Sequence, residues 1–493
     1  MAVSTRPHDP PAASAQPLTT RSAAALAAAI RAGETTSRAV VEAHVALLRR
    51  VNPALNAVVV DRYDAALADA DAADARIAAT PAAERDALPP LLGVPCTVKE
   101  SISLAGMPNC TGLVARAAHR CEQTAPAAQR MLDAGAIPLG VTNTSELCMW
   151  IESDNRVYGR TGNAYDATRI SGGSSGGEGA SVGSGGSPVG LGSDVGGSIR
   201  GPAFFNGVFG HKPTPGLVPM MLSYPPVREG SEIARMVANG PLVRRAEDLM
   251  PLLRLLSGPD GLDASMRDAT LGDPAGVQLD GLRVVVPDDC FVSPIARELL
   301  AARERAAGAL AAAGARVERI SLRSARGIYE PYLSSLGDGP ETLEQLMLGE
   351  GAARSTWRDL LRGGGPHTAP TRLLIASERL SARNPAKRRQ RAIEAGRAFA
   401  RELEERIGDG VMLFPPYPNV APRHGGTVGR LWWIHPMAVF NLAGLPATAV
   451  PLGLGRAGLP LGVQVAAGPD RDHVSIAVAL ELERVFGGWV PPA

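Results

Sequence analysis

The sequence has no excess of charge of either sign. Its 50 lysines and arginines balance 49 aspartates and glutamates, so the formal net charge is +1 at pH 7. A protein that collects nucleic acid or an anionic membrane does so through a strongly basic surface. The balance therefore argues against a nucleic-acid partner and favours a small neutral molecule.

Long apolar runs, a leader segment and paired cysteines are also absent. No stretch approaches the ~20 apolar residues that cross a bilayer. The start of the chain, MAVSTRPHDPPAASAQPLTT, has no apolar core of a secretory signal. The five cysteines lack the short paired spacings of a zinc site. We expect free thiols, no metal, no cofactor, no integral membrane segment and a cytoplasmic protein.

The rest of the composition suits a large globular core, because 45% of the residues are hydrophobic. After an arm at 1–17 that we expect to be disordered, apolar residues recur at helical intervals between Thr20 and Asp74. A helix followed by a strand is predicted at 127–142, a step that builds layered α/β domains. Short apolar strands closed by Pro or Gly are predicted at 283–287, 411–415 and 448–451. The segment 89–103 predicts a turn that leads into a short β-branched strand with Lys99 and Glu100 at its end. These elements predict one α/β domain around a mixed sheet, with a peripheral helical region at 321–405 that covers the substrate site.

The most unusual segment is 170–202, ISGGSSGGEGASVGSGGSPVGLGSDVGGSIRGP. A flexible linker is one interpretation, but apolar residues are interleaved with the glycines and serines. A phosphate-binding loop is a second, but no Gly-Lys-Ser/Thr step follows the glycines. The third is nucleophilic catalysis by a serine, and we favour it.

The phrase 194–198, DVGGS, provides what such a serine requires. Two glycines before Ser198 permit backbone conformations that other residues avoid. Successive N–H groups of Val195, Gly196, Gly197 and Ser198 can then converge as an oxyanion hole beside the Ser198 hydroxyl.

A serine nucleophile also needs a base. The eight histidines are scattered, and no G-x-S-x-G elbow surrounds Ser198. His211 follows the segment closely, but a structural role at a turn suits its GHKP context better. Lys99 ends a short apolar strand, and burial there would favour its neutral amine. Taken alone, Lys99 is equally compatible with an ordinary surface charge at a strand end.

Three separated motifs resemble the amidase signature family. They are GVPCTVK at 93–99, GGSSGG at 172–177 and GGSIR at 196–200, and they occur in the order typical of that family. The resemblance extends from about Leu18 to the C-terminus, and phrases such as ELCMWIESDNRVYGR are closest to the second type of fatty-acid amide hydrolase. It implies one domain, 18–493, in which helices cover both faces of a central mixed β-sheet.

The resemblance implies a role for each matching residue. Ser198 would be the nucleophile that forms an acyl-enzyme, Lys99 the base, and Ser174 the proton relay between them, after a cis peptide bond at Gly173–Ser174. Supporting positions around this Ser-cisSer-Lys triad would be Ser175, Asp194 and Arg200. The reaction implied is hydrolysis of a carboxylic amide to an acid and an amine or ammonia.

The resemblance constrains the substrate less than the reaction. Cys148 and Met149 stand where the family contacts the acyl group, although they and Trp150 are equally compatible with the core. Fatty-acid or aryl amides are the expected substrates. The membrane-bound fatty-amide enzymes carry an N-terminal anchor, whereas this arm is polar, which argues against lipid amides delivered from a bilayer.

Two other functions remain compatible with the sequence. One is the glutamine-hydrolysing subunit that amidates misacylated tRNA, and the other is an inactive binding protein on the same fold. The intact Lys99, Ser174 and Ser198 argue against the inactive protein. The oligomeric state is open, with a homodimer as one option.

Overall fold

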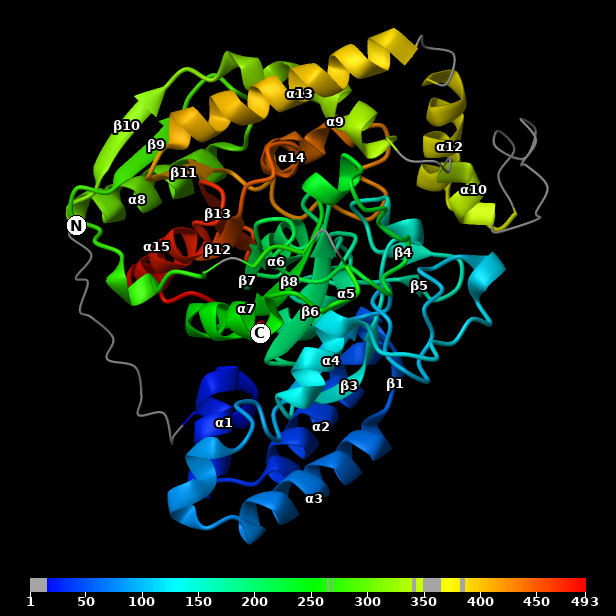
Figure 1. Cartoon of the computed structure of the whole chain (residues 1–493), viewed down its shortest axis with the longest axis vertical. Coiled ribbons are helices and arrows are strands. Elements are labelled where there is room, and N and C mark those ends of the chain that lie inside the picture. The colour runs from blue at the N-terminus through cyan, green and yellow to red at the C-terminus, as the bar shows by residue number, and fades with distance from the viewer. Residues whose placement is uncertain (1–15, 264–265, 269, 339–342, 349–364, 382–385) are drawn as a thin grey trace.

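The computed structural model describes residues 16–263, 266–268, 270–338, 343–348, 365–381 and 386–493. Its centre is an 11-stranded sheet in the order β1-β3-β2-β6-β8-β7-β12-β13-β11-β9-β10 (Figure 1). The strands of this sheet are β1 (Val58–Asp61), β2 (Pro95–Lys99), β3 (Ile137–Thr142), β6 (Val189–Asp194), β7 (Phe209–Lys212), β8 (Ala238–Val243), β9 (Arg283–Pro287), β10 (Arg316–Ile320), β11 (Val411–Phe414), β12 (Ala447–Leu454) and β13 (Pro460–Ala467). A separate two-stranded sheet pairs β4 (Asp154–Asn155) with β5 (Gly159–Arg160).

Helices surround this sheet. They are α1 (Ala23–Ala32), α2 (Ser37–Leu55), α3 (Tyr63–Ala79), α4 (Pro126–Asp133), α5 (Gly176–Gly183), α6 (Arg200–Phe205), α7 (Leu249–Leu256), α8 (Arg297–Ala312), α9 (Tyr329–Leu336), α10 (Leu343–Leu348), α12 (Ala369–Ser381), α13 (Ala386–Ile407), α14 (His435–Leu442) and α15 (Asp472–Phe486). Within the described ranges, no helix combines the length and the apolar character needed to cross a membrane.

Strand β11 shows how both faces of the sheet are covered. Val411 and Leu413 join the apolar cluster that includes side chains of α8 and α15. Met412 and Phe414, whose side chains alternate with these, join a second cluster with residues of α13 and α14. The predicted α/β domain with helices on both faces of a central sheet is therefore confirmed.

The sheet is mixed, as predicted. β2 pairs in parallel with β3 and β6, and β9 pairs in parallel with β10 and β11, whereas the remaining neighbours are antiparallel. Because β2, β3 and β6 are parallel, their carboxyl ends meet at one edge of the sheet. Lys99, Thr142 and Asp194 are the last residues of these strands, and ligands of α/β sheets bind at such edges.

The glycine- and serine-rich segment is an ordered part of the core and not a linker. It forms α5, β6 and the start of α6, and nearly all of its residues are buried. The glycines of α5 permit this burial, because they let the helix approach neighbouring backbone closely. A Cβ at Gly177, for example, would lie 2.3 Å from the Asn143 backbone nitrogen.

The prediction of helices alone between Thr20 and Asp74 is wrong at one place. The run Val58–Asp61 forms β1, which pairs antiparallel with β3. Asn56 adopts the left-handed conformation that ends α2, and three successive valines favour a strand after it. Thr36 caps the start of the preceding helix α2, since its side chain accepts a hydrogen bond from the Ala39 N–H group.

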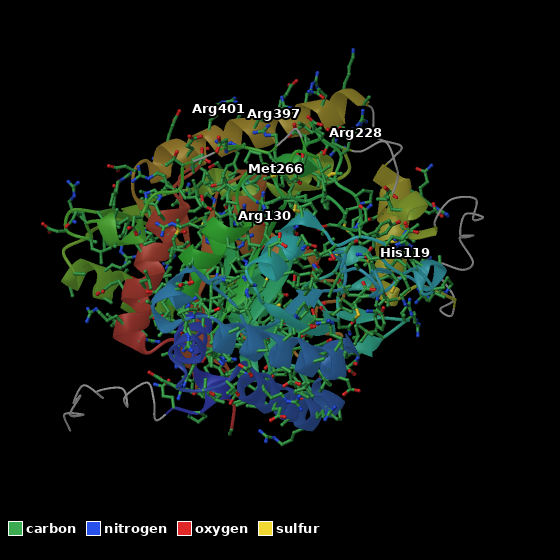
Figure 2. All side chains as sticks on the ribbon, turned by 60° about the horizontal axis from the view of Figure 1, so that its bottom comes forward. His119, Arg130, Arg228, Met266, Arg397 and Arg401 are labelled. Atoms are coloured by element: carbon green, nitrogen blue, oxygen red, sulfur yellow. The ribbon has the colours of Figure 1, made fainter. Side chains whose placement is uncertain are left out.

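The described parts of the region 321–405 consist mainly of helices joined by short turns, and residues 339–342, 349–364 and 382–385 lie outside the described part. In Figure 1, α13 runs along the top of the molecule above α9 and α14, and it packs against both. Arg397 of α13, labelled in Figure 2, is paired with Glu232, which directly precedes the short helical turn Ile233–Arg235. The expected disordered arm at 1–17 falls almost entirely outside the described residues.

Asn52 holds the reversal from α2 into β1. Its Oδ1 accepts hydrogen bonds from the N–H groups of Ala57 (2.8 Å) and Val58 (2.9 Å), and its Nδ2 donates to the Val58 carbonyl (2.8 Å). We expect Asn52→Ala to reduce the unfolding free energy by about 2 kcal/mol, because it leaves partly buried backbone groups without partners. The lowered melting temperature is measurable by calorimetry. Asn419→Ala, at an exposed position, is the matched control, and an equal loss in both variants would contradict the prediction.

Candidate active site

The amine of Lys99 lies at the centre of the candidate site. Its side chain is fully buried at the end of β2. Nζ is 2.6 Å from the Ser174 hydroxyl and 2.9 Å from the Ser193 hydroxyl. No carboxylate of the described residues is paired directly with it. Ser193 was not predicted, because a contact with a lysine 94 positions away leaves no local pattern in the sequence.

Burial lowers the pKa of the Lys99 ammonium from its ordinary value. Interactions with Cys148, Asp194 and Glu178 act in the opposite direction and raise it. Desolvation dominates, so the neutral amine is accessible at a lower pH than for an exposed lysine.

Ser174 and Ser175 enter the site from the loop before α5. The peptide bond between Gly173 and Ser174 is cis, as the resemblance implies. The Ser153 hydroxyl fixes this turn, because it donates to the Ser174 carbonyl (3.0 Å) and accepts from the Gly176 N–H (2.9 Å). No local sequence pattern predicts this role of Ser153.

Ser175 connects this loop to the segment that carries Ser198. Its N–H donates to the Ser198 carbonyl at 3.2 Å, and its hydroxyl donates to the Ser193 carbonyl at 3.3 Å. Ser198 retains 8% exposure, whereas Ser174 retains 1%. Of the two hydroxyls, the one on Ser198 is therefore the more accessible from outside.

The loop between β6 and α6 is organised around the Asp194 carboxylate. It accepts hydrogen bonds from the N–H groups of Gly197 (2.7 Å) and Ile199 (3.1 Å) and from Nδ2 of Asn441 (2.9 Å). It also forms a fully buried ion pair with Arg200, whose Nε lies 3.0 Å away. Burial alone would raise the pKa of the Asp194 carboxyl, but Arg200, Lys212 and these hydrogen bonds hold the pKa well below its usual range.

Gly197 is needed for this loop to close. Its φ of +105° is disfavoured for residues with a side chain, and a Cβ there would lie 2.3 Å from the Met437 sulfur. Because its N–H is bonded to Asp194, the four predicted oxyanion donors are reduced to Val195, Gly196 and Ser198 in this conformation. Their N–H groups have no backbone or side-chain acceptor in the part of the chain that the structure describes.

Cys148 and Met149 are half-buried, and Cys148 interacts with the Lys99 amine. Trp150, in contrast, is buried and donates a hydrogen bond to the Thr427 hydroxyl at 2.9 Å. Trp150 therefore belongs to the core. Leu147 and Cys148 both have positive φ, 52° and 58°, so the chain turns sharply here.

A family model described as Amidase matches residues 39–475. The chain belongs to the amidase signature family. It is 41% identical to fatty-acid amide hydrolase 2-B of Danio rerio, over 97% of this chain and 91% of the relative. It is also 32% identical to indoleacetamide hydrolase of Bradyrhizobium diazoefficiens, over 94% and 86%. A bacterial aryl acylamidase of the amidase signature family shares the fold, with a TM-score of 0.82 and 23% identity over 95% of this chain and 97% of that one.

This amidase signature protein is accordingly a hydrolase of amide C–N bonds. His211 has a structural role, as predicted, but it lies in strand β7 and not at a turn. The His211 ring is fully buried between the Thr448 hydroxyl (2.9 Å) and the Asp472 carboxylate (3.0 Å), which tie β7 to β12 and α15.

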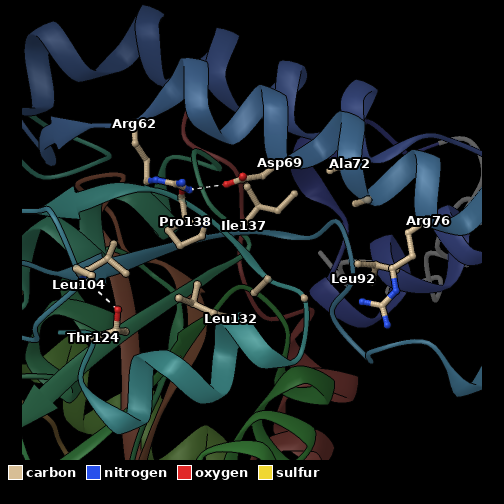
Figure 3. A pocket seen from close by; sticks show the side chains of 14 residues that line it. Arg62, Asp69, Ala72, Arg76, Leu92, Leu104, Thr124, Leu132, Ile137 and Pro138 are labelled. Carbon is tan, nitrogen blue, oxygen red and sulfur yellow. Dashed lines mark hydrogen bonds and ion pairs between the residues drawn. The ribbon is translucent and has the colours of Figure 1, made fainter.

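A cavity of about 440 Å³ lies away from the candidate active site, between α3 and the segment that joins α4 to β3. Figure 3 shows Arg62 paired with Asp69 at its rim, above apolar side chains such as Leu132. Lys99, Ser174 and Ser198 do not line it.

Asp194→Asn should strongly destabilise this amidase, because it leaves the Arg200 guanidinium buried without a compensating charge. Breaking a buried pair in this way costs about 3–5 kcal/mol, which calorimetry would detect as a large drop in melting temperature. The matched control is Asp71→Asn, whose carboxylate is 60% exposed and pairs with Arg38. An exposed pair contributes at most about 1 kcal/mol, so similar losses in the two variants would refute the role assigned to Asp194.

Proposed function

We propose that this amidase acts through an acyl-enzyme on Ser198, with Lys99 as base and Ser174 as proton relay. The observation that carries the proposal is the 2.6 Å contact between the fully buried Lys99 Nζ and the Ser174 hydroxyl. A neutral amine in that contact accepts a proton from a hydroxyl, and an ammonium does not. His211, the first histidine after Ser198 in the chain, is hydrogen-bonded to Asp472 and is not available as the base.

In the proposed acylation, the Ser198 oxygen attacks the amide carbonyl while its proton passes to Ser174 and the Ser174 proton passes to Lys99. The carbonyl oxygen becomes an oxyanion, and the N–H groups of Val195, Gly196 and Ser198 are the candidate donors to it. The proton then returns through Ser174 to the leaving nitrogen as the C–N bond breaks. An amine leaves poorly until it is protonated, so this return makes amides cleavable. Water activated by the same relay releases the acid.

The proposed substrate is an amide of an apolar carboxylic acid, either fatty or aromatic. The names of the two relatives, fatty-acid amide hydrolase and indoleacetamide hydrolase, both describe such amides. Met149 supports this choice, because it packs against an apolar cluster of Leu113, Leu147, Met347 and Ile375. Cys148 and Met149 would face the acyl group. The cytoplasmic location and the homodimer remain predictions.

The helical region 321–405 is proposed to cover this acyl site. Glu146, which directly precedes the Leu147–Met149 turn, accepts hydrogen bonds from His367 Nδ1 (2.6 Å), the Thr368 N–H (2.9 Å) and the Thr371 hydroxyl (2.8 Å). The start of α12 is thus fixed to the turn that carries the proposed acyl contacts.

Ser198→Ala should abolish both turnover and covalent labelling by a fluorophosphonate while the melting temperature stays near that of the wild type, since only one small polar atom is lost. Labelling is read by mass spectrometry and turnover by the released amine, on a panel of amides that varies the acyl chain. Ser184→Ala, in the same glycine-rich segment, is the control and should label normally. Near-normal turnover in Ser198→Ala would eliminate this nucleophile.

Lys99 should act as a neutral amine, so kcat/KM should rise with pH as its ammonium loses the proton. Since burial lowers its pKa, the rise should occur below the range of an ordinary lysine, and it should be absent in Lys99→Ala. Lys99→Arg should be as inactive as the alanine variant, because a guanidinium does not deprotonate at accessible pH. Lys387→Arg, on the exposed surface of α13, is the control. Substantial activity in Lys99→Arg would mean that the site needs a charge and not a base.

A further inference from the structure

A second buried ionisable group, Glu178, lies beneath the proposed base. Glu178 belongs to α5 and is fully buried. Its two carboxylate oxygens accept hydrogen bonds from different strands: Oε2 from the Thr97 hydroxyl of β2 (2.5 Å) and Oε1 from the Thr142 hydroxyl of β3 (2.7 Å). Both hydrogen bonds favour the charged form of the carboxyl group.

The sheet makes room for this carboxylate. On β6, a Cβ at Gly190 would lie 2.0 Å from Glu178 Oε2, and Thr97 of β2 is the direct partner of Gly190 in the strand pairing. Any side chain at position 190 would displace the carboxylate. The glycine, the two threonines and the glutamate therefore form one site, built from three adjacent strands and a helix.

Glu178 lies on the same face of the sheet as the proposed base. Thr97 and Lys99 are alternate residues of β2, and their side chains consequently point the same way. The segment that supplies Ser174 continues directly into α5, so Ser174 and Glu178 approach this face from one short stretch of chain. Lys99 contacts the serine hydroxyls, and Glu178 acts on it through space without touching it.

The two groups influence each other's protonation. Burial raises the pKa of the Glu178 carboxyl to about 8, against the hydrogen bonds from Thr97 and Thr142 and the charge of Lys99. For Lys99, burial lowers the pKa, and the charges that oppose this come from Cys148, Asp194 and Glu178. Cys96 lies on the opposite face of β2, and its pKa is raised by burial and by the charge of Glu178. A carboxylate at Glu178 and an ammonium at Lys99 thus stabilise each other.

We propose that Glu178 is a positioning residue for hydrolysis: anchored by Thr97 and Thr142, its carboxylate stabilises the ammonium that forms on Lys99 when Ser198 is deprotonated. This inference rests on the proposed function, in which Lys99 is the base. Where Glu178 is charged, its carboxylate makes Lys99 a stronger base and lowers the fraction of free amine.

The test compares kcat/KM across pH for the wild type and Glu178→Gln, together with the pH dependence of fluorophosphonate labelling, which needs the base but no leaving amine. The amide keeps the shape of the carboxyl group and can bond both threonines. Without the negative charge the Lys99 ammonium is less stable. The rising part of the plot of kcat/KM against pH, here called the limb, should therefore move to lower pH by roughly half to one unit. The plateau of kcat/KM should fall several-fold because the base is weaker.

Glu100→Gln is the matched control. Glu100 follows Lys99 in the chain and is equally buried, but it bonds the N–H groups of Cys110 and Thr111 and the Tyr158 hydroxyl. Its variant should lose thermal stability without moving the limb. A purely structural role of Glu178 would likewise lower stability or overall activity and leave the limb in place.

Each outcome has a distinct meaning. If the wild-type limb is present and is lost in Lys99→Ala, but Glu178→Gln leaves it unmoved or moves it to higher pH, the role of Glu178 is refuted and the base is retained. If the wild type has no limb that depends on Lys99, the proposed function itself fails. Should Glu178→Gln not fold, Thr142→Val removes one hydrogen bond that favours the charged carboxylate. It should move the limb in the same direction by less, and an unmoved limb there refutes the proposal.

Discussion

The buried ion pair between Asp194 and Arg200 is the constraint on which the rest of the site depends. Arg200 bonds not only Asp194 but also the Gln464 and Asn441 side chains and the Met437 carbonyl. The pair thereby connects the end of β6, the start of α6, helix α14 and strand β13. Two charges removed from water require such complete hydrogen bonding, and loss of either partner is costly. The segment between them, which includes Ser198, is held in place as a consequence.

The same carboxylate limits what the loop offers to a substrate. A glycine pair before a serine suggests a row of equivalent N–H donors, but the Gly197 N–H is turned inward to Asp194. The hydrogen bond to the Asp194 carboxylate stabilises the positive φ of Gly197. The neighbouring N–H groups of Val195, Gly196 and Ser198 do not bond this carboxylate. One N–H group of the row is thus used to shape the loop, and the other three have no acceptor among the described residues.

Much of the fold was predictable from the sequence because its signals are local. The strand ending at Lys99, the helix and strand at 126–142 and the Thr36 cap depend on apolar patterns and caps within a few residues. The order of eleven strands has no such signal, and β1 was missed because a four-residue strand between two helices depends on its pairing with β3.

The candidate site divides in the same way. The segment from Asp194 to Arg200 is contiguous, so its glycines and serine stand out in the sequence. Contacts made by Ser153, Met437 and Asn441 are set by tertiary packing and leave no local pattern. Glu178 was overlooked because one acid in a glycine-rich helix resembles a solvated charge until the two threonines that bind it are seen.

Burial by itself does not make a lysine a base in this protein, as Lys212 demonstrates. Lys212 is also fully buried, and burial, together with the nearby Arg200, lowers its pKa to about 7 against the charges of Asp194 and Asp472. Its Nζ, however, donates to the Pro213 carbonyl at 3.0 Å. A carbonyl has no proton to give, so a neutral amine at Lys212 has nothing to deprotonate there. Lys99 differs in its neighbours, two serine hydroxyls, and this contact supports the proposal that Lys99, and not Lys212, is the base.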